Sequence, residues 1–293
     1  MIELSGSITA LVTPFNEGSV DGDTYQALIE RQISNGTRAI VPGGTTGESA
    51  TITHDEHKLI IKLAVEAAAG RVPVVAGAGS NSTAEAIELA KFAQDAGADA
   101  LLTVTGYYNK PTQEGLIAHF TALHDATSLP MVLYNVPGRT VANQSVETIG
   151  RLSRLERVIA LKDATGDLAR IPMQTLSSAP GFIQLSGEDM TAVGFNAMGG
   201  QGCIGVTANI APALCAQMQN ASLTGDLDAA ISIQNKLAPL HEAIFVETSP
   251  APVKYAMSLM GLMTADVRLP LVGPTPALKE RLRDILVELS LVD

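Results

Sequence analysis

Short apolar segments alternate along the chain with longer segments of helical periodicity. The apolar segments start 20 to 33 residues apart, a spacing typical of a strand–helix repeat. They predict eight strands, at residues 7–12, 39–41, 72–76, 100–104, 131–134, 158–161, 182–185 and 202–206. The amphipathic patterns between them predict helices, most clearly at residues 24–34, 53–69, 83–96, 113–127, 145–152 and 190–198.

Eight repeats favour one closed parallel barrel, the (β/α)8 or TIM barrel. A doubly wound open sheet is the competing architecture, but the strand count and the length of 293 residues fit the barrel better. The chain beyond residue 206 is far longer than one barrel helix, and its periodicity predicts helices at 211–223, 227–245, 251–261 and 276–289. We therefore predict a barrel over residues 1–223 and a helical extension over 224–293 that packs on it, since no low-complexity linker separates them.

Composition narrows the possible partners and the compartment. The chain has 30 acidic and 19 basic residues and a net charge of −11, which argues against nucleic acid because phosphate binding needs clustered cations. No basic region precedes an apolar run at the start, and no apolar stretch is long enough to span a membrane. Cys203 and Cys215 lack metal-ligand spacing and predict buried free thiols. We expect a cytoplasmic protein.

Small and polar residues gather directly after the predicted strands. In a barrel, the loops that follow the strands build the active site. These loops lie at residues 13–15, 42–49, 77–82, 105–111, 134–140, 162–167, 186–189 and 207–209. Ordinary turn chemistry explains their glycines, but it does not explain a lysine and a tyrosine at strand ends.

Lys162 is the first candidate for chemistry. It follows an apolar strand, and the alternation of side chains along a strand places it on the same face as Ala160. If that face is the barrel interior, the apolar surroundings favour the neutral amine, which attacks carbonyl carbons. If the lysine turns to solvent, it is an ordinary strand-end residue. Position alone leaves both interpretations open.

Tyr134 and Arg139 are weaker candidates when each is taken singly. Tyr134 ends a predicted strand, where a phenol near a lysine amine would be placed to relay protons. Arg139 lies in a loop beside Pro137 and Gly138, where its guanidinium would be placed to bind a carboxylate. A half-buried aromatic residue and a surface arginine are the ordinary structural alternatives.

The segment 43–57 offers several polar groups. Its start, Gly-Gly-Thr-Thr-Gly-Glu, lacks the Gly-Lys-Ser/Thr ending of a nucleotide-binding loop, but its N–H groups and hydroxyls suit a small carboxylate. Thr53 and Glu56 have the spacing of a capping box. His54 and His57 would supply only two metal ligands with no third in view, so we favour the cap and predict no metal site.

Taken together, these segments resemble the 4-hydroxy-tetrahydrodipicolinate synthase family. It belongs to the pyruvate-dependent class I aldolase superfamily, which also contains N-acetylneuraminate lyase. Each matching segment is weak alone, but their order and spacing are specific. The segments are GTTGESAT at 44–51, HDEH at 54–57, TAEAI at 83–87, YYN at 107–109, YNVPGRT at 134–140, KDATG at 162–166 and VTAN at 206–209.

The resemblance implies a reaction and a set of residues. Pyruvate and L-aspartate 4-semialdehyde would condense to 4-hydroxy-tetrahydrodipicolinate, the first step of the diaminopimelate and lysine pathway, without a metal or organic cofactor. The enzyme would be a homotetramer, a dimer of dimers. The implied catalytic residues are Lys162 as the Schiff-base lysine, Tyr134 as proton donor and acceptor, and Thr45 with Tyr108 as the relay, with Tyr108 supplied by a neighbouring subunit. The implied substrate-binding residues are Thr46, Arg139, Gly187 and, through its carbonyl, Ile204.

The resemblance also implies feedback inhibition by L-lysine at a dimer interface. The matching effector positions are Ser49, Ala50, His54, His57, Asn81, Glu85 and Tyr107. Helix capping and a polar dimer seam are the structural alternatives for these residues. One departure from the family pattern is Gly106, where proline usually precedes the tyrosine pair.

Two other functions remain open from the sequence. The chain could be another pyruvate aldolase, acting on a sialic or deoxy-sugar acid, although Arg139 suits a short substrate carboxylate better. It could also be an inactive barrel that binds lysine or pyruvate as a sensor, although Lys162 and the relay residues are intact.

Overall fold

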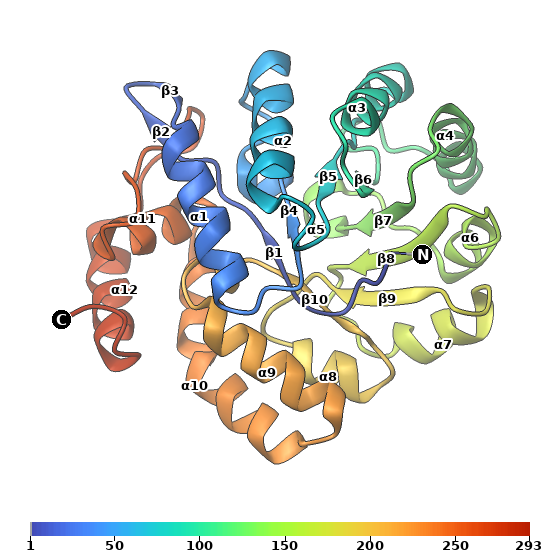
Figure 1. Cartoon of the computed structure of the whole chain (residues 1–293). Helices are drawn as coiled ribbons and strands as arrows, with labels where there is room; N and C mark the ends of the chain where they lie inside the picture. Colours follow the sequence, from blue (N-terminus) through green and yellow to red (C-terminus); the bar gives the residue numbers. More distant parts are fainter. Residues whose placement is uncertain (1) are drawn as a thin grey trace.

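Eight parallel strands form the centre of the molecule in the computed structural model, which describes residues 2–293 (Figure 1). The order around the sheet is β4-β1-β10-β9-β8-β7-β6-β5, and a bridge between Ile40 and Val74 closes it into a barrel. The predicted TIM barrel is confirmed, and all eight predicted strands are present. They are β1 Gly6–Ala10, β4 Ala39–Val41, β5 Val75–Gly77, β6 Ala100–Val104, β7 Met131–Asn135, β8 Val158–Asp163, β9 Ile183–Ser186 and β10 Gly202–Gly205.

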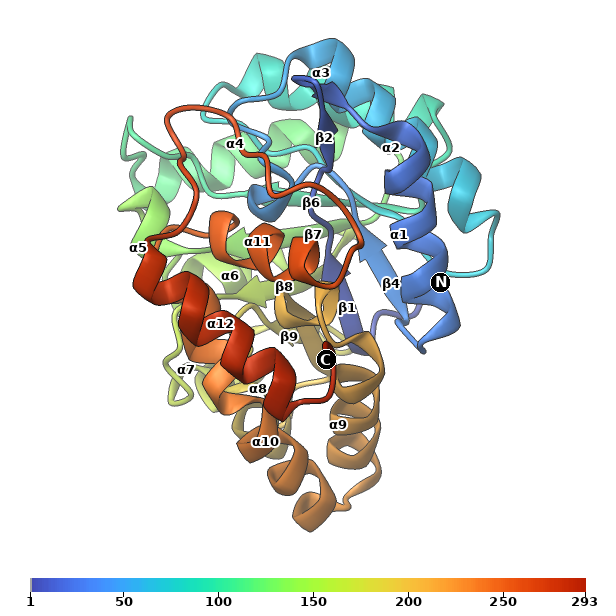
Figure 2. The ribbon, with the colours of Figure 1, turned by 90° about the vertical axis from the view of Figure 1, so that its left-hand side faces the viewer.

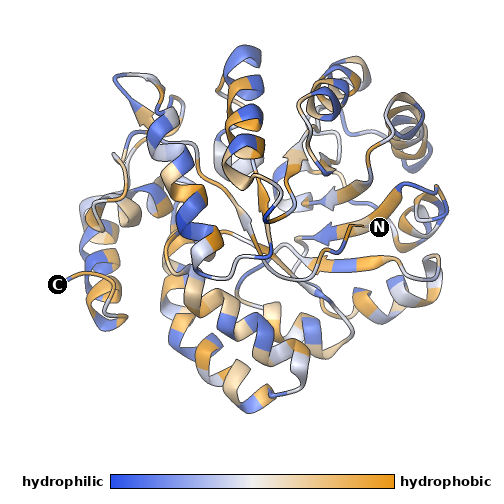
Figure 3. Cartoon of the chain, in the orientation of Figure 1, coloured by the Kyte–Doolittle hydropathy of each residue, from blue (hydrophilic) through white to orange (hydrophobic). Residues whose placement is uncertain are grey.

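Helices surround this barrel and largely follow the predicted pattern. They are α1 Gly22–Ser34, α2 His54–Ala68, α3 Thr83–Asp95, α4 Gln113–Ala126, α6 Val146–Leu152, α7 Arg170–Ser177, α8 Ala192–Ala197 and α9 Pro212–Thr224. The pattern did not single out α7, an eight-residue helix that buries Ile171 and Gln174. Figure 3 shows the outer helices mixing hydrophobic and hydrophilic residues, as expected for elements buried on one side.

Short elements fill the loops at the carboxyl ends of the strands. They are the hairpin of β2 Phe15–Asn16 and β3 Ser19–Val20, the 3-10 helices η1 Thr45–Gly47 and η2 Thr207–Asn209, and the one-turn helix α5 Pro137–Thr140. Side chains accept hydrogen bonds from N–H groups of the first turn in α1, α2, α3, α4 and α6, whereas α7, α8 and α9 begin without such a cap. Thr53 and Glu56 form the predicted capping box at the start of α2.

The barrel interior is filled by side chains from every strand. Figure 1 shows the strands gathered around one centre. Ile8, Val41, Leu102, Val132 and Leu185 belong to one cluster of buried residues inside the barrel. The strands are buried on both faces, because the helices cover their outer side. A polar site is therefore confined to an end of the barrel, and in (β/α)8 barrels it lies at the carboxyl ends of the strands.

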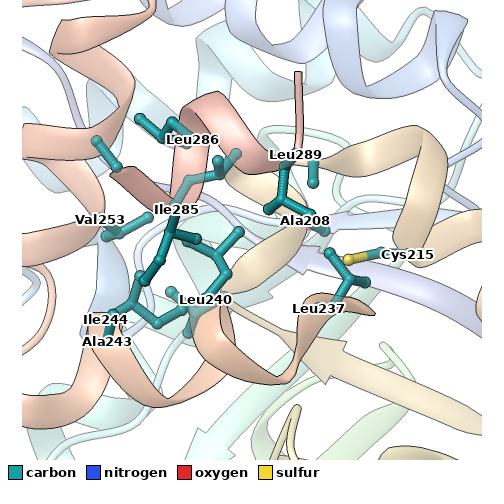
Figure 4. Close-up of a cluster of buried hydrophobic side chains, with 14 of the residues drawn as sticks. Ala208, Cys215, Leu237, Leu240, Ala243, Ile244, Val253, Ile285, Leu286 and Leu289 are labelled. Atoms are coloured by element: carbon teal, nitrogen blue, oxygen red, sulfur yellow. The ribbon is translucent and has the colours of Figure 1, made fainter. Parts of the chain in front are cut away.

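The C-terminal extension packs on the barrel through α10 Leu227–Val246, α11 Ala251–Leu259 and α12 Pro276–Glu288. Figure 4 shows Leu237, Leu240 and Ile244 of α10 meeting Ile285 and Leu286 of α12 in one buried cluster. The same cluster includes Ala208 and Cys215, from η2 and α9. In the side view of Figure 2, α11 and α12 lie in front of the barrel strands.

The connection between barrel and extension is very short. Helix α9 ends at Thr224, Gly225 caps it in the left-handed conformation with φ of 87°, and α10 begins at Leu227. The boundary between residues 223 and 224 stays a prediction, because one apolar cluster spans both sides of it.

Two further sequence expectations concern burial and membranes. Cys203 and Cys215 are buried free thiols, as predicted, and burial raises the pKa of both. Within residues 2–293, no helix has the length and apolar character needed to cross a bilayer.

The shared cluster predicts that the extension is integral to stability. Truncating the fully buried Leu286 to alanine should lower the free energy of unfolding by about 2–5 kcal/mol, from lost burial and the cavity left behind. Val287→Ala is the matched control, because the neighbouring Val287 is exposed on the same helix. Urea unfolding at fixed protein concentration measures both variants. Equal effects of the two substitutions would contradict the packing role.

Candidate active site

Lys162 and Tyr134 face each other inside the carboxyl end of the barrel. They are register partners on the adjacent parallel strands β8 and β7. Their exposed fractions are only 5% and 7%, and the Lys162 Nζ lies 4.3 Å from the centroid of the Tyr134 ring. Ala160 is buried in the barrel interior on the same strand. The solvent-facing interpretation of Lys162 is therefore wrong, and the interior one is confirmed.

Gly187 lies against the alkyl chain of this lysine. A Cβ atom at Gly187 would lie 3.0 Å from the Lys162 Cε, 3.1 Å from its Cγ and 2.8 Å from the Ala164 Cβ. Such contacts are too close for any larger side chain without displacing its neighbours. The Gly187 N–H also donates to the Asp163 carbonyl at 2.7 Å, so the two loops meet directly beside the amine.

Asp163 anchors the end of strand β8. Its buried carboxylate accepts hydrogen bonds from the Thr165 N–H at 2.9 Å, the Arg170 Nε at 3.1 Å and the Gln174 Nε2 at 2.7 Å. Hydrogen bonds to both oxygens of this buried carboxylate hold the backbone at Asp163 in one conformation. The position of Lys162, one residue earlier, is thereby held from outside the barrel.

Thr45 and Thr46 lie on the short 3-10 helix η1, after strand β4. Thr46 is buried, and the hydroxyl of Thr13 donates to the Gly47 carbonyl at 2.7 Å. Gly43, just before η1, passes so close to Gly77 that a Cβ at Gly77 would lie 2.2 Å from the Gly43 oxygen. The loops after β4 and β5 are thus in direct backbone contact, which places the two threonines at the mouth of the barrel.

A cavity of about 380 Å³ opens beside this turn. It joins two groups of residues that the sequence treated separately. Thr45 and Arg139, assigned to the reaction, line it together with the predicted effector residues Ser49, Ala50, His54, His57, Glu85 and Tyr107. A smaller space of about 30 Å³ is lined by Thr45 and Tyr134, so Thr45 lies between the cavity and the buried tyrosine.

Glu85 is the best-connected polar group on the cavity wall. It contacts the His54 Nε2 at 2.8 Å and accepts a hydrogen bond from the Ser80 hydroxyl. The Ser80 hydrogen bond, followed by that of His54, lowers the pKa of Glu85. A carboxylate held in its charged form is suited to bind a cation.

His57 and Asn81 occupy different surroundings. His57 is buried, and its Nε2 donates to the Gly77 carbonyl at 2.7 Å. Burial lowers the pKa of His57, which favours the neutral ring. Asn81 lies outside the set that lines the cavity. Its carbonyl accepts a hydrogen bond from the Asn109 Nδ2 at 2.8 Å, which ties the loop of the tyrosine pair to the start of α3.

The two neighbouring tyrosines, Tyr107 and Tyr108, have different surroundings. Tyr107 lines the cavity, whereas Tyr108 has φ of 71° and is 91% exposed. A single chain therefore does not bring Tyr108 to Thr45 and Tyr134. The backbone at Gly106 avoids the left-handed region, and a Cβ there would make only ordinary contacts, the nearest at 3.4 Å from Pro111.

Arg139 and Ile204 complete the predicted set. Arg139 lies exposed on α5, lines the cavity and donates to the Ser249 carbonyl of the extension at 3.5 Å. Ile204 is fully buried on β10, where it pairs with Ile8 inside the barrel.

The structure adds polar residues that the sequence interpretation did not assign. Glu188 follows Gly187, and burial raises the pKa of its carboxyl group while the nearby Lys162 amine opposes that shift. Glu48 follows η1 and forms a fully buried ion pair with Lys254 of α11. Glu48 lies in the matching segment GTTGESAT at 44–51, but nothing in the sequence around Lys254 indicated that this lysine pairs with it.

Comparison with known proteins agrees with this architecture. The model of the dihydrodipicolinate synthetase family matches residues 3–289. The chain belongs to this family.

Individual relatives extend this result to the enzyme class. The chain is 57% identical over 279 residues to the 4-hydroxy-tetrahydrodipicolinate synthase of Cereibacter sphaeroides, covering 95% of this chain and 96% of that protein. Among solved structures it is similar to the chloride-inhibited dihydrodipicolinate synthase of Acinetobacter baumannii complexed with pyruvate, with a TM-score of 0.97, 43% identity, and coverage of 99% and 100%. It is also similar to the lysine-bound enzyme of Cyanidioschyzon merolae, with a TM-score of 0.95, 37% identity, and coverage of 98% and 99%.

These comparisons confirm the predicted family and its class of lyase. The roles of individual residues remain predictions, for which the geometry above is the basis.

The buried histidine on the cavity wall predicts a pH dependence of stability. Since the pKa of His57 is lower in the folded than in the unfolded chain, unfolding takes up a proton. The free energy of unfolding is therefore highest, as far as His57 is concerned, above about pH 6.5. Below that pH, His57 lowers it by at most about 1.4 kcal/mol per pH unit. His119 and His241, whose pKa values burial also lowers, act in the same direction.

The His57→Gln variant tests this dependence, since glutamine can still donate to the Gly77 carbonyl. Its free energy of unfolding should fall less than that of the parent between about pH 7.5 and about pH 5.5. Urea unfolding at both pH values measures this difference. An unchanged pH dependence in the variant would exclude His57 as a contributor.

Proposed function

We propose that this protein condenses pyruvate with L-aspartate 4-semialdehyde through a Schiff base on Lys162, giving 4-hydroxy-tetrahydrodipicolinate. The observation that carries the proposal is the buried amine of Lys162 facing the Tyr134 ring at the carboxyl end of the barrel. Membership of the family and the names of its relatives support the choice of substrates. The lysine itself performs the covalent chemistry, so the reaction uses no metal or organic cofactor.

The first half of the reaction activates pyruvate. The Lys162 amine attacks the ketone carbon, and loss of water leaves an imine. The protonated imine withdraws electrons from the adjacent methyl group, which then loses a proton to give an enamine. Tyr134 lies beside the amine and moves protons during these steps, with Thr45 and Tyr108 linking it to solvent.

The second half forms the carbon–carbon bond and releases the product. The enamine carbon attacks the aldehyde carbon of the second substrate, and the aldehyde oxygen takes up a proton. The amine of that substrate then attacks the imine carbon and displaces Lys162. The ring closes in this step, and the free lysine is regenerated.

Substrate binding follows from the placement of polar groups around the amine. The η1 turn carries Thr46, which binds the pyruvate carboxylate, and Ile204 contributes its backbone carbonyl. Gly187 leaves room beside the lysine chain, as its close approach to Lys162 indicates. Arg139 lines the mouth of the cavity and binds the carboxylate of the aldehyde substrate as a charged hydrogen-bond donor.

The proposed assembly is a homotetramer made of two tight dimers, acting in the cytoplasm at the entry to diaminopimelate and lysine synthesis. The exposure of Tyr108 supports a role in a neighbouring subunit, because a side chain that contacts so little of its own chain is free to enter another.

L-Lysine is the proposed feedback inhibitor. Six of the seven predicted effector residues line the cavity, and the charged Glu85 offers a partner for an ammonium group. The lysine-bound relative supports the choice of ligand. In this site the amino acid would replace His54 as the partner of Glu85.

Trapping the imine tests the mechanism directly. Borohydride treatment with pyruvate should yield a pyruvate-sized adduct on Lys162, located by mass spectrometry, and the Lys162→Ala variant should yield none. Arg139→Gln is the matched control, since it should keep the adduct and lose about 10- to 100-fold in kcat/KM for the aldehyde substrate. The absence of an adduct on folded parent protein would overturn the proposal. If Arg139→Gln reduced adduct formation with pyruvate as much as the reaction with the aldehyde, the assigned aldehyde substrate would be rejected.

Feedback inhibition has its own test in helix α3. Glu85→Gln should raise the L-lysine concentration for half-inhibition by about 10- to 100-fold, because a charged hydrogen bond to the effector is lost. Glu88→Gln is the control, since Glu88 lies one turn later and pairs with Lys58 away from the cavity. Steady-state rates with and without L-lysine measure the shift. Equal shifts in both variants, or a parent enzyme that L-lysine does not inhibit, would contradict this site.

A further inference from the structure

The turn that carries Thr45 and Thr46 ends in an unusual residue. Glu48 caps η1 in the left-handed conformation with φ of 58°, which costs energy for any residue other than glycine. Its side chain points into the protein, where it is completely buried. A strained backbone and a buried carboxylate at one position require strong compensating contacts.

The C-terminal extension supplies two of these contacts. The Lys254 Nζ of α11 donates to the Glu48 Oε1 at 2.7 Å and to the Thr13 carbonyl at 2.8 Å, with its own side chain fully buried. The backbone N–H of Arg268 donates to the second oxygen, Oε2, at 3.0 Å. Both carboxylate oxygens are therefore bound by groups more than 200 residues away along the chain.

An aromatic ring and a second ion pair complete the arrangement. The Lys254 Nζ lies 4.1 Å from the Phe15 ring centroid, and the Arg268 guanidinium lies 4.4 Å from it. Arg268 also forms two hydrogen bonds with Glu56, at 2.6 and 2.5 Å, which lower the pKa of Glu56 to about 2. In Figure 2 the chain after α11 passes beside β2, as the hydrogen bond from Thr264 to the Phe15 carbonyl requires.

Stability alone does not account for this arrangement. A buried ion pair loses so much hydration that apolar residues of similar size often serve stability as well or better. The pair lies where η1 ends, two residues after Thr46. Catalytic groups must be held within about 0.5 Å of their productive position, and such precision comes from locked supporting residues.

We propose that Glu48 is a positioning residue, held by Lys254 and the Arg268 backbone of the C-terminal extension, that fixes the η1 turn so that Thr45 and Thr46 meet pyruvate. The inference rests on the proposed function. It makes the extension a working part of the pyruvate site.

Replacing both members of the Glu48–Lys254 ion pair with uncharged residues distinguishes an effect on the position of the turn from an effect on stability. In the double variant Glu48→Gln/Lys254→Met, no buried charge is left unpaired, so its Tm should stay close to that of the parent. A glutamine presents one acceptor oxygen where the carboxylate had two, so the turn loses part of its anchor. The KM for pyruvate should rise about tenfold or more, and borohydride trapping at Lys162 should slow by a similar factor. The KM for the aldehyde substrate should change by less than about twofold.

Controls keep the outcome decisive. Arg281→Gln breaks an exposed ion pair with Glu242 within the same extension and should leave all kinetic constants unchanged. Glu48→Gln alone should show the same pyruvate defect together with a lower Tm, because it leaves the Lys254 charge buried and unpaired.

Two results would overturn the positioning role. One is a double variant with parental pyruvate kinetics, and the other is an equal rise of both KM values. The failure of the proposed function is a separate result, because the parent protein itself would then form no pyruvate adduct.

Discussion

The parallel register between β7 and β8 is the constraint on which the site depends. It makes Tyr134 and Lys162 direct neighbours, and closure of the barrel turns both side chains inward. A lysine amine placed among apolar side chains beside a phenol is protected from competing water and close to a group that exchanges protons. The network around Asp163 preserves this register, because it fixes the residue that follows the lysine.

The loops at the mouth depend on contacts from distant parts of the chain. Arg139 reaches the Ser249 carbonyl, and Glu48 is bound by Lys254 and Arg268. The same extension shares an apolar cluster with η2 and α9. The barrel thus supplies the strand ends, and the extension contacts two of the loops that follow them. Fold and site are stabilised by the same contacts.

One cavity connects the residues assigned to the reaction with those assigned to the effector. Thr45, Glu85 and His57 all line it. His57 donates to the carbonyl of Gly77, whose backbone lies against Gly43 just before the η1 turn. Arg268 makes a second connection, because it binds both Glu48 and the first turn of α2 through Glu56.

The sequence by itself determined the order of strands and helices, the capping box at Thr53 and the strand-end position of Lys162, because these depend on local periodicity and on neighbours a few residues apart. Its motifs also predicted the family. Only the tertiary structure decided that Lys162 faces inward, that Tyr108 is left exposed and that Glu48 pairs with Lys254. Those outcomes depend on barrel closure and on contacts between residues about 200 positions apart. Such contacts do not change the local hydrophobic pattern, because each partner fits the helix or loop in which it lies.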